Sequence, residues 1–291
     1  MQKVKQIENV IIPSPEKLEK IKRLIKAGGG ENLYVLSDFD RTLTKAFVNG
    51  ECRPSLISIL RDEGYLASDY GQKARDLYNK YHAIEVDRDI PLAKRKKMMA
   101  RWWRAHFSLL LKSGLNKKDV ERAVKSKKIK FRDGFCEFVG LLRRYQIPLV
   151  ILSSGGLGKE AVSMCLEKVN VLYDNIHIVS NSYIWDKKGN AVGLQKPIIH
   201  SLNKNEIKVR RFPEIYKRVK NRRNVILLGD NREDTAMTEG FKFGNLLKVG
   251  FLNERVEENL KEYKRCYDVL ILDDGGMKYI NDLLKEILKR G

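Results

Sequence analysis

Two carboxylates follow an apolar run near the N-terminus of this 291-residue chain. The run begins at Tyr34 and ends at Ser37, and the residues after it are Asp38-Phe-Asp40-Arg-Thr42. An apolar run of this length predicts a buried strand. Just past its end the backbone turns, so both carboxylates and the Asp40 carbonyl can face one point. Such a point suits Mg²⁺, which prefers oxygen ligands, and a carboxylate nucleophile with an acid–base group beside it.

Three further polar motifs follow apolar runs later in the chain. Phosphoryl transfer at a carboxylate also needs a hydroxyl for the phosphate, a cation and a second metal-binding acid. The motifs supply these groups in order: Ser153-Ser154-Gly-Gly, then Asn203-Lys204, then Gly229-Asp230-Asn-Arg-Glu-Asp234. Four such elements in this order resemble the haloacid dehalogenase (HAD) phosphatase superfamily.

Longer segments make the resemblance more specific. They are similar to the pyrimidine/cytosolic 5′-nucleotidase III family, from about Val10 to the end of the chain. That family implies a Rossmann-like core, a helical cap inserted after the first motif, Mg²⁺, and hydrolysis of nucleoside 5′-monophosphates. The segments are Ile25-Lys-Ala-Gly-Gly, Lys80-Tyr-His-Ala-Ile-Glu85-Val-Asp, His200-Ser-Leu-Asn-Lys204, Val225-Ile-Leu-Leu-Gly-Asp-Asn-Arg-Glu-Asp and Gly250-Phe-Leu-Asn-Glu-Arg-Val.

The resemblance and the chemistry of the groups imply roles for the acids. Asp38 would attack phosphorus and form an aspartyl phosphate. Asp40 would protonate the leaving 5′-oxygen and then deprotonate the water that hydrolyses the intermediate, which requires a raised pKa. Asp38, the Asp40 carbonyl and Asp230 would hold Mg²⁺.

The remaining motif residues are expected to hold the phosphate. Ser153 would donate its hydroxyl to a phosphate oxygen, with the backbone N–H groups of Ser154 and Gly155 beside it. Lys204 would balance charge between the phosphate and Asp38. Asp234 is expected to support the metal site indirectly, through a ligand or a water.

Glu85 is the candidate nucleoside contact. The family uses a glutamate at the matching place, and a carboxylate can accept from an exocyclic amino group such as that of cytosine. His82 is either a neighbour in the same pocket or a packing residue. Two departures stand out: the stretch 49–58 carries no ring to stack on a base, and Arg41 replaces the more usual apolar residue, with a side chain expected to point away.

Secondary-structure patterns predict how these residues are positioned. Strands and helices alternate after residue 131, which predicts a Rossmann-type α/β core with a parallel sheet. Residues 52–130 show helical periodicity and predict a bundle of about four helices. We therefore predict a core of residues 1–48 and 131–291 with an inserted helical cap of residues 49–130. The elements expected in the core are a helix from Pro15 capped by Ser14, a helix 135–145, strands 148–153, 176–180, 225–229, 246–251 and 268–272, and helices 158–168, 234–240 and 277–289.

Charge is concentrated in two segments. The chain has 57 Lys and Arg against 37 Asp and Glu, a net charge of +20. Residues 94–132 hold 15 basic and 2 acidic residues, and residues 204–223 hold 9 basic and 2 acidic. These segments are either solvated helix faces or an electropositive field that attracts phosphates or nucleic acid.

Other features limit the possible classes of protein. The 4 cysteines show no zinc or disulfide spacing. We expect a cytoplasmic location, because the chain shows no signal peptide or membrane span. The oligomeric state is not indicated.

The predicted function is that of an Mg²⁺-dependent 5′-nucleotidase acting on pyrimidine nucleoside monophosphates. One alternative is the same chemistry on another small phosphate ester, of the phosphoserine type or 7-methylguanosine monophosphate. A second is a nucleic-acid-binding protein on a retired phosphatase fold, which the retained acids and lysine make the weaker hypothesis.

Overall fold

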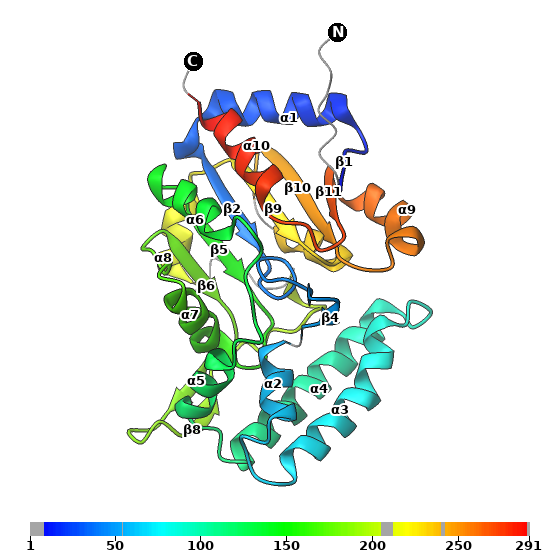
Figure 1. The fold of residues 1–291 in the computed structure, drawn as a ribbon, viewed down its shortest axis with the longest axis vertical. Helices are drawn as coiled ribbons and strands as arrows, with labels where there is room; N and C mark the ends of the chain where they lie inside the picture. Colours follow the sequence, from blue (N-terminus) through cyan, green and yellow to red (C-terminus); the bar gives the residue numbers. More distant parts are fainter. Residues whose placement is uncertain (1–8, 54, 205–211, 240–241, 290–291) are drawn as a thin grey trace.

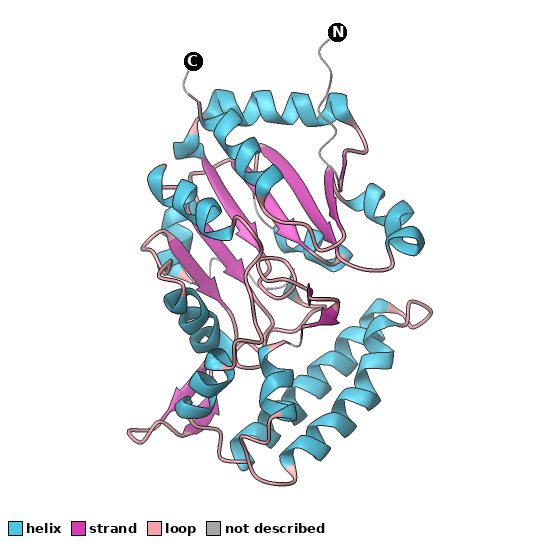
Figure 2. Cartoon of the chain, viewed as in Figure 1, coloured by secondary structure: helices cyan, strands magenta, loops and turns pink. Residues whose placement is uncertain are grey.

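A seven-stranded sheet forms the centre of the computed structural model, which describes residues 9–53, 55–204, 212–239 and 242–289 (Figures 1 and 2). Its order is β1-β11-β10-β9-β2-β5-β6. All neighbours are parallel except β1, which pairs antiparallel with β11 at one edge. The α/β prediction is confirmed, with the antiparallel edge strand as an addition. The strands are β1 (Val10–Ile11), β2 (Leu33–Ser37), β5 (Leu149–Leu152), β6 (Ile176–Val179), β9 (Asn224–Gly229), β10 (Asn245–Leu252) and β11 (Val269–Leu272).

Both faces of the sheet are covered by helices. Successive side chains of a strand point to opposite faces. Val35 of β2 accordingly belongs to the larger apolar cluster with residues of α1, α6, α7 and α10, whereas Leu36 belongs to a second cluster with residues of α8 and the 3-10 helix η4. Burial on both faces explains why these strands are continuous apolar runs. The helices are α1 (Pro15–Gly28), α6 (Phe135–Arg144), α7 (Gly158–Lys168), α8 (Pro213–Val219), η4 (Arg232–Thr238), α9 (Val256–Cys266) and α10 (Lys278–Leu288), with a 3-10 turn η1 (Gly30–Asn32).

Four α-helices occupy the described part of residues 52–130. They are α2 (Leu56–Asp62), α3 (Tyr70–Val86), α4 (Leu92–Lys112) and α5 (Lys117–Lys125). Helices α2, α3 and α4 lie on the side of the sheet toward which the strand arrows point (Figure 1). Helix α3 packs on α4 and on α2, and α2 packs on α5, which also packs on the core helix α7. The four helices therefore contact one another in series, and α5 also contacts the core.

The two chain connections to these helices run side by side. Thr44 and Phe131 form an antiparallel bridge. The Lys45 N–H donates to the Lys130 carbonyl at 2.8 Å, and the Arg132 N–H donates to the Leu43 carbonyl at 3.0 Å. The inserted helices thus leave and rejoin the core at one place.

Several local features differ from the predictions. The predicted helix 234–240 is a 3-10 helix over residues 232–238, and residue 240 lies outside the described part. Two short hairpins were missed: β3 (Phe47–Val48) with β4 (Glu51–Cys52), and β7 (Tyr183–Trp185) with β8 (Ala191–Leu194). Ser14 precedes α1 as predicted, but its side chain makes no capping hydrogen bond. Residues 205–211 of the second basic segment lie outside the described part.

No described helix combines the length and the apolar character needed to cross a membrane.

Candidate active site

Two adjacent parallel strands bring Asp38 and Asp230 together. Strands β2 and β9 pair in register, with Ser37 opposite Leu228, so Asp38 and Asp230 follow neighbouring strand ends. The Asp38 N–H donates to the Leu228 carbonyl at 3.1 Å, which extends the ladder to the acid itself. In open α/β sheets, ligands bind beyond these carboxyl ends.

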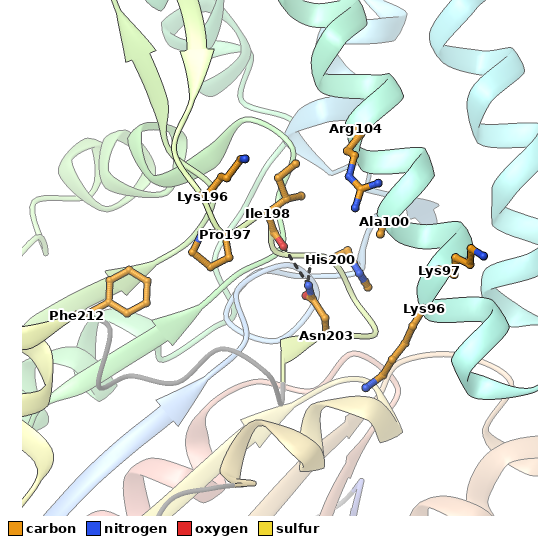
Figure 3. Close-up of a pocket in the computed structure, with 10 residues that line it drawn as sticks. All are labelled: Lys96, Lys97, Ala100, Arg104, Lys196, Pro197, Ile198, His200, Asn203 and Phe212. Atoms are coloured by element: carbon orange, nitrogen blue, oxygen red, sulfur yellow. Dashed lines mark hydrogen bonds between the residues drawn. The ribbon is translucent and has the colours of Figure 1, made fainter.

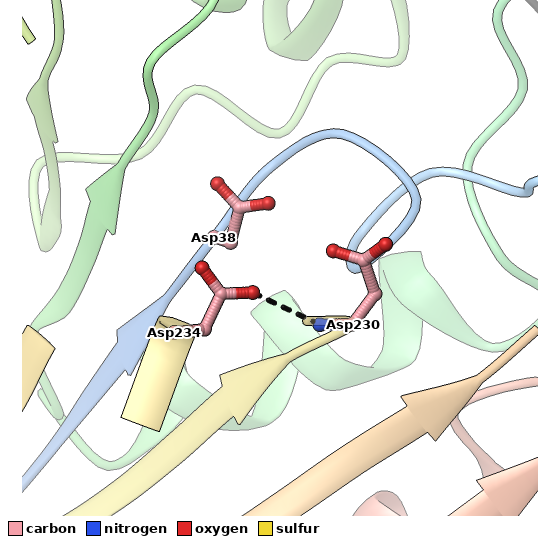
Figure 4. Close-up of side chains that lie close together, drawn as sticks. All are labelled: Asp38, Asp230 and Asp234. Carbon is pink, nitrogen blue, oxygen red and sulfur yellow. Dashed lines mark hydrogen bonds between the residues drawn. The ribbon is translucent and has the colours of Figure 1, made fainter. Parts of the chain in front are cut away.

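Three carboxylates form a cluster at this edge. One oxygen from each of Asp38, Asp230 and Asp234 lies within 4.8 Å of the others (Figure 4). Asp230 accepts from the Thr42 hydroxyl at 3.2 Å. One carboxylate oxygen of Asp234 accepts from the backbone N–H groups of Asp230 at 3.2 Å and Asn231 at 3.0 Å, which fixes the turn that follows β9.

Lys204 lies between two of these acids. Its ammonium donates to Asp38 at 2.5 Å and to the other oxygen of Asp234 at 2.8 Å. Only 4% of Lys204 is exposed. Both oxygens of Asp234 therefore have protein donors, and Asp234 orients Lys204 and the turn after β9. The sequence alone did not define this role of Asp234.

Burial controls the protonation of the cluster. It raises the pKa of Asp38, and the Lys204 ammonium opposes that rise. Burial and the nearby Asp234 charge raise the pKa of Asp230 to about 7. Burial alone would lower the pKa of Lys204, but Asp234 and Asp38 outweigh it and raise that pKa, so Lys204 is charged at neutral pH.

The cluster fits a hard divalent cation. Ionised carboxylates that lie close together repel one another, which raises their pKa values. A bound cation lowers these pKa values again. The donor set consists of oxygen atoms, as Mg²⁺ requires. We expect Asp38 and Asp230 to bind it, because both carboxylate oxygens of Asp234 accept from protein donors.

Asp230→Asn is expected to raise the Mg²⁺ concentration needed for half-maximal activity by at least about tenfold. The amide keeps the shape and an acceptor for Thr42, so the melting temperature in chelator should change little. A Mg²⁺ titration of activity on the variant and the wild type measures this. An unchanged Mg²⁺ dependence would assign the metal to other residues.

The phosphate-loop candidates follow β5. Ser153 is buried, and its hydroxyl accepts from the Gly155 N–H at 3.0 Å. A Cβ at Gly155 would lie 3.2 Å from the Ser153 hydroxyl and 3.6 Å from an Asp40 carboxylate oxygen, so Gly155 sits between these two groups. The Ser154 carbonyl accepts from the Asn181 amide at 3.4 Å. The loop thus packs closely against Asp40.

Glu85 contacts the loop that carries Lys204. Its carboxylate accepts from the Ser201 hydroxyl and lies 3.2 Å from the His82 ring nitrogen Nδ1. The His82 ring stacks on Tyr78, with centroids 4.7 Å apart. Tyr78, His82 and Glu85 therefore share one face of α3. This face supplies a ring beside Glu85, which the stretch 49–58 does not.

Two arginines have roles that the sequence did not indicate. Arg132 is buried and donates to the Thr42 carbonyl at 2.7 Å, to Asn253 at 2.7 Å and to Asp274 at 3.0 Å, so it holds the loop after Asp40. Arg41 pairs with Glu254 at 2.6 Å, and its charge opposes the rise that burial causes in the pKa values of Asp40 and Asp230. Arg41 therefore acts on the site through its charge. The position of Arg41 within the first motif was the sequence signal that could have indicated its role. For Arg132, the sequence indicated only that the chain re-enters the core there.

Known protein families and sequence relatives match most of this chain. The family model for pyrimidine 5′-nucleotidase (UMPH-1) matches residues 41–288. A Gallus gallus protein named 7-methylguanosine phosphate-specific 5′-nucleotidase is 33% identical over 284 residues, covering 97% of each chain. A Caenorhabditis elegans protein named putative cytosolic 5′-nucleotidase 3 is 31% identical over 273 residues, covering 92% of this chain and 72% of the relative.

Solved structures agree with the fold. Cytosolic 5′-nucleotidase IIIB bound to cytidine has a TM-score of 0.87 and 30% identity, covering 97% of this chain and 94% of that one. A substrate-bound phosphoserine phosphatase complex has a TM-score of 0.51 and 19% identity, covering 86% and 97%. The second likeness shows the fold alone.

Proposed function

Because this chain belongs to the pyrimidine 5′-nucleotidase family, and is a phosphomonoester hydrolase of the 5′-nucleotidase class, we propose that it prefers nucleoside 5′-monophosphates whose base offers an amino group to Glu85. CMP and 7-methylguanosine 5′-monophosphate both meet this condition, whereas UMP does not. The observation that supports this most directly is the contact between Glu85 and Ser201, three residues before Lys204. The proposed base contact on α3 therefore lies against the loop that carries Lys204.

The reaction follows from the acids at the strand ends. Asp38 attacks phosphorus, the bond to the 5′-oxygen breaks, and an aspartyl phosphate forms. Asp40 gives its proton to the leaving oxygen, then takes a proton from the water that attacks the intermediate. Asp38, Asp230 and the Asp40 carbonyl would hold Mg²⁺, which would neutralise charge on the phosphoryl oxygens.

Other groups hold the transferring phosphoryl. The Ser153 hydroxyl and the backbone N–H groups after it are donors for the phosphoryl oxygens. Lys204, charged and beside the nucleophile, offsets the negative charge that accumulates between the phosphate and Asp38. Binding, orientation and charge compensation of this kind account for most of the rate of phosphoryl transfer.

Asp40 should give the reaction a distinctive dependence on pH and leaving group. Burial raises its pKa to about 6, against the opposing charges of Lys204 and Arg41. A raised pKa keeps the acid protonated below about 6, so the rate on CMP should fall as the pH rises above this value. Formation of the aspartyl phosphate from p-nitrophenyl phosphate, whose leaving group needs no proton, should not show this fall when it is followed as the first burst of p-nitrophenol release. Asp40→Asn should slow CMP turnover by about 10²-fold and this burst much less. An equal loss in CMP turnover and in the burst rate would contradict a general acid at Asp40.

Glu85→Gln tests the proposed base contact. The amide keeps an acceptor for Ser201 but loses the negative charge, so kcat/KM for CMP and 7-methylguanosine monophosphate should fall by about tenfold or more. Turnover of p-nitrophenyl phosphate should not change. The measurement is kcat/KM for these three substrates and UMP, with Glu121→Gln on α5 as the control. A uniform loss on all four substrates would reject the base contact while leaving the nucleotidase assignment in place.

The proposed reaction also bears on the binding partners and the location of the protein. The partner is the nucleotide itself, no nucleic acid is needed by the reaction, and the relative named cytosolic supports a cytoplasmic location. The hypothesis of a retired phosphatase is not supported, because the chain belongs to a family of nucleotidases.

A further inference from the structure

A basic cavity of about 920 Å³ lies between α4 and the segment 196–203 (Figure 3). Cavities that bind small molecules have volumes of about 300–1,000 Å³. The described lining includes none of the site acids Asp38, Asp40 and Asp230, nor Lys204. The cavity is therefore separate from the cluster at the strand ends. Its lining residues are Lys96, Lys97, Ala100, Arg104, Lys196, Pro197, Ile198, His200, Asn203 and Phe212.

The lining charges select an anion. Lys96, Ala100 and Arg104 are spaced four residues apart, so they follow one face of α4. Besides Lys96, the lining has three cationic side chains, those of Lys97, Arg104 and, across the cavity, Lys196, and no carboxylate occurs among the described lining residues. A cavity lined by charges of one sign raises the local concentration of ligands of opposite charge. Three such cations suit a ligand with several phosphates better than one with a single phosphate.

An aromatic ring at the other end narrows the ligand class further. Phe212 and Pro197 lie at one side of the cavity, and the cations of α4 lie at the other (Figure 3). A ring next to a proline forms an apolar platform on which a planar base can stack. A base at Phe212 with phosphates directed toward α4 describes a nucleoside polyphosphate.

The cavity wall includes the loop that carries the catalytic lysine. The Asn203 side chain accepts from the His200 N–H at 2.8 Å and donates to the Ile198 carbonyl at 3.0 Å, which holds the segment in shape. Leu202 packs with Tyr81, Met99 and Trp102 of α3 and α4. The next residue after Asn203 is Lys204, which donates to Asp38. A ligand that contacts His200 and Asn203 therefore acts on the segment that positions Lys204.

We propose that this cavity is a second nucleotide site, which binds a nucleoside polyphosphate and changes the turnover number through the segment 198–204. The site is regulatory, since its described lining lacks the acids that hydrolysis requires. It is independent of which base the catalytic site prefers.

ATP and inorganic tripolyphosphate are the probes for this site. Binding is measured by equilibrium dialysis in the presence of excess CMP and a chelator, and CMP hydrolysis is measured with and without ATP at constant free Mg²⁺. We expect ATP to change kcat rather than to raise only KM. Lys97→Glu and Arg104→Glu should each weaken ATP binding by at least about tenfold. Phe212→Leu should weaken ATP binding but not tripolyphosphate binding.

Lys118→Glu is the matched control, because it reverses an exposed lysine of α5 that does not line the cavity. ATP binding to this variant should equal that of the wild type. Three outcomes would each overturn the proposal. The first is purely competitive inhibition by ATP that Arg104→Glu does not affect, and the second is ATP binding that leaves kcat unchanged. The third is that Lys118→Glu weakens ATP binding as much as the cavity variants do. Tighter binding of a single-stranded oligonucleotide than of ATP, lost in the same variants, would overturn it in favour of a nucleic-acid surface.

Discussion

Asp38→Asn is expected to reduce turnover of CMP by at least about 10³-fold. An amide cannot attack phosphorus, so the covalent step is removed. The fold should be unaffected, because asparagine has the same shape and its oxygen can still accept from Lys204. Burial raises the pKa of Asp38, so replacing this acid with a neutral group should not lower the melting temperature.

The measurement is kcat with Mg²⁺, together with thermal unfolding of both proteins. Beryllofluoride, which mimics an acyl phosphate, should inhibit the wild type. Asp76→Asn, at an exposed position of α3, controls for the loss of one carboxylate and should retain full activity. More than a few per cent of wild-type turnover in a clean Asp38→Asn preparation would rule out the aspartyl-phosphate mechanism.

Lys204→Met is expected to affect both catalysis and stability. Methionine fills similar space but leaves two buried carboxylates without their cation. The rate should fall by about 10²–10³-fold, the loss seen when one donor to a transition-state charge is removed. The free energy of unfolding should fall by about 3–5 kcal/mol, as when one partner of a buried ion pair is removed. Lys204 is only 4% exposed, so solvent screening does not reduce this effect.

The stability loss should depend on pH in a defined direction. Burial raises the pKa of Asp38 and Lys204 opposes that rise, so without Lys204 this pKa lies still further above its unfolded value. Asp38 is then protonated and harmless at low pH, and its ionisation destabilises the fold as the pH rises through the folded-state pKa. Urea unfolding in chelator should therefore show a smaller difference from the wild type at pH 5 than at pH 8. Lys220→Met, at an exposed lysine, should show no difference at either pH.

The sequence predicted the elements that bury apolar residues on both faces. The predicted strands 148–153 and 225–229 lie within one residue of β5 and β9 at each end, because a central parallel strand is a continuous apolar run. The order of motifs along such strands was enough to bring Asp38, Asp230 and Lys204 into one site. The catalytic roles of these residues remain predictions.

The parts that the sequence did not predict depend on distant contacts. Arg132 interacts with Asn253 and Asp274, which are more than 100 residues away, and no local pattern encodes these hydrogen bonds. Strands β3 and β4 have two residues each, too few to show alternation. The basic cavity combines α4 with the segment 196–203, so composition revealed its charge but not its shape.

The paired connections at Thr44 and Phe131 also matter for how such proteins change over evolutionary time. An insertion whose two ends meet can be lengthened, shortened or exchanged without altering the distance that the core must bridge. We therefore expect that changes of substrate can come from substitutions in the helices between these two connections, while the strand ends that carry the acids keep their sequence.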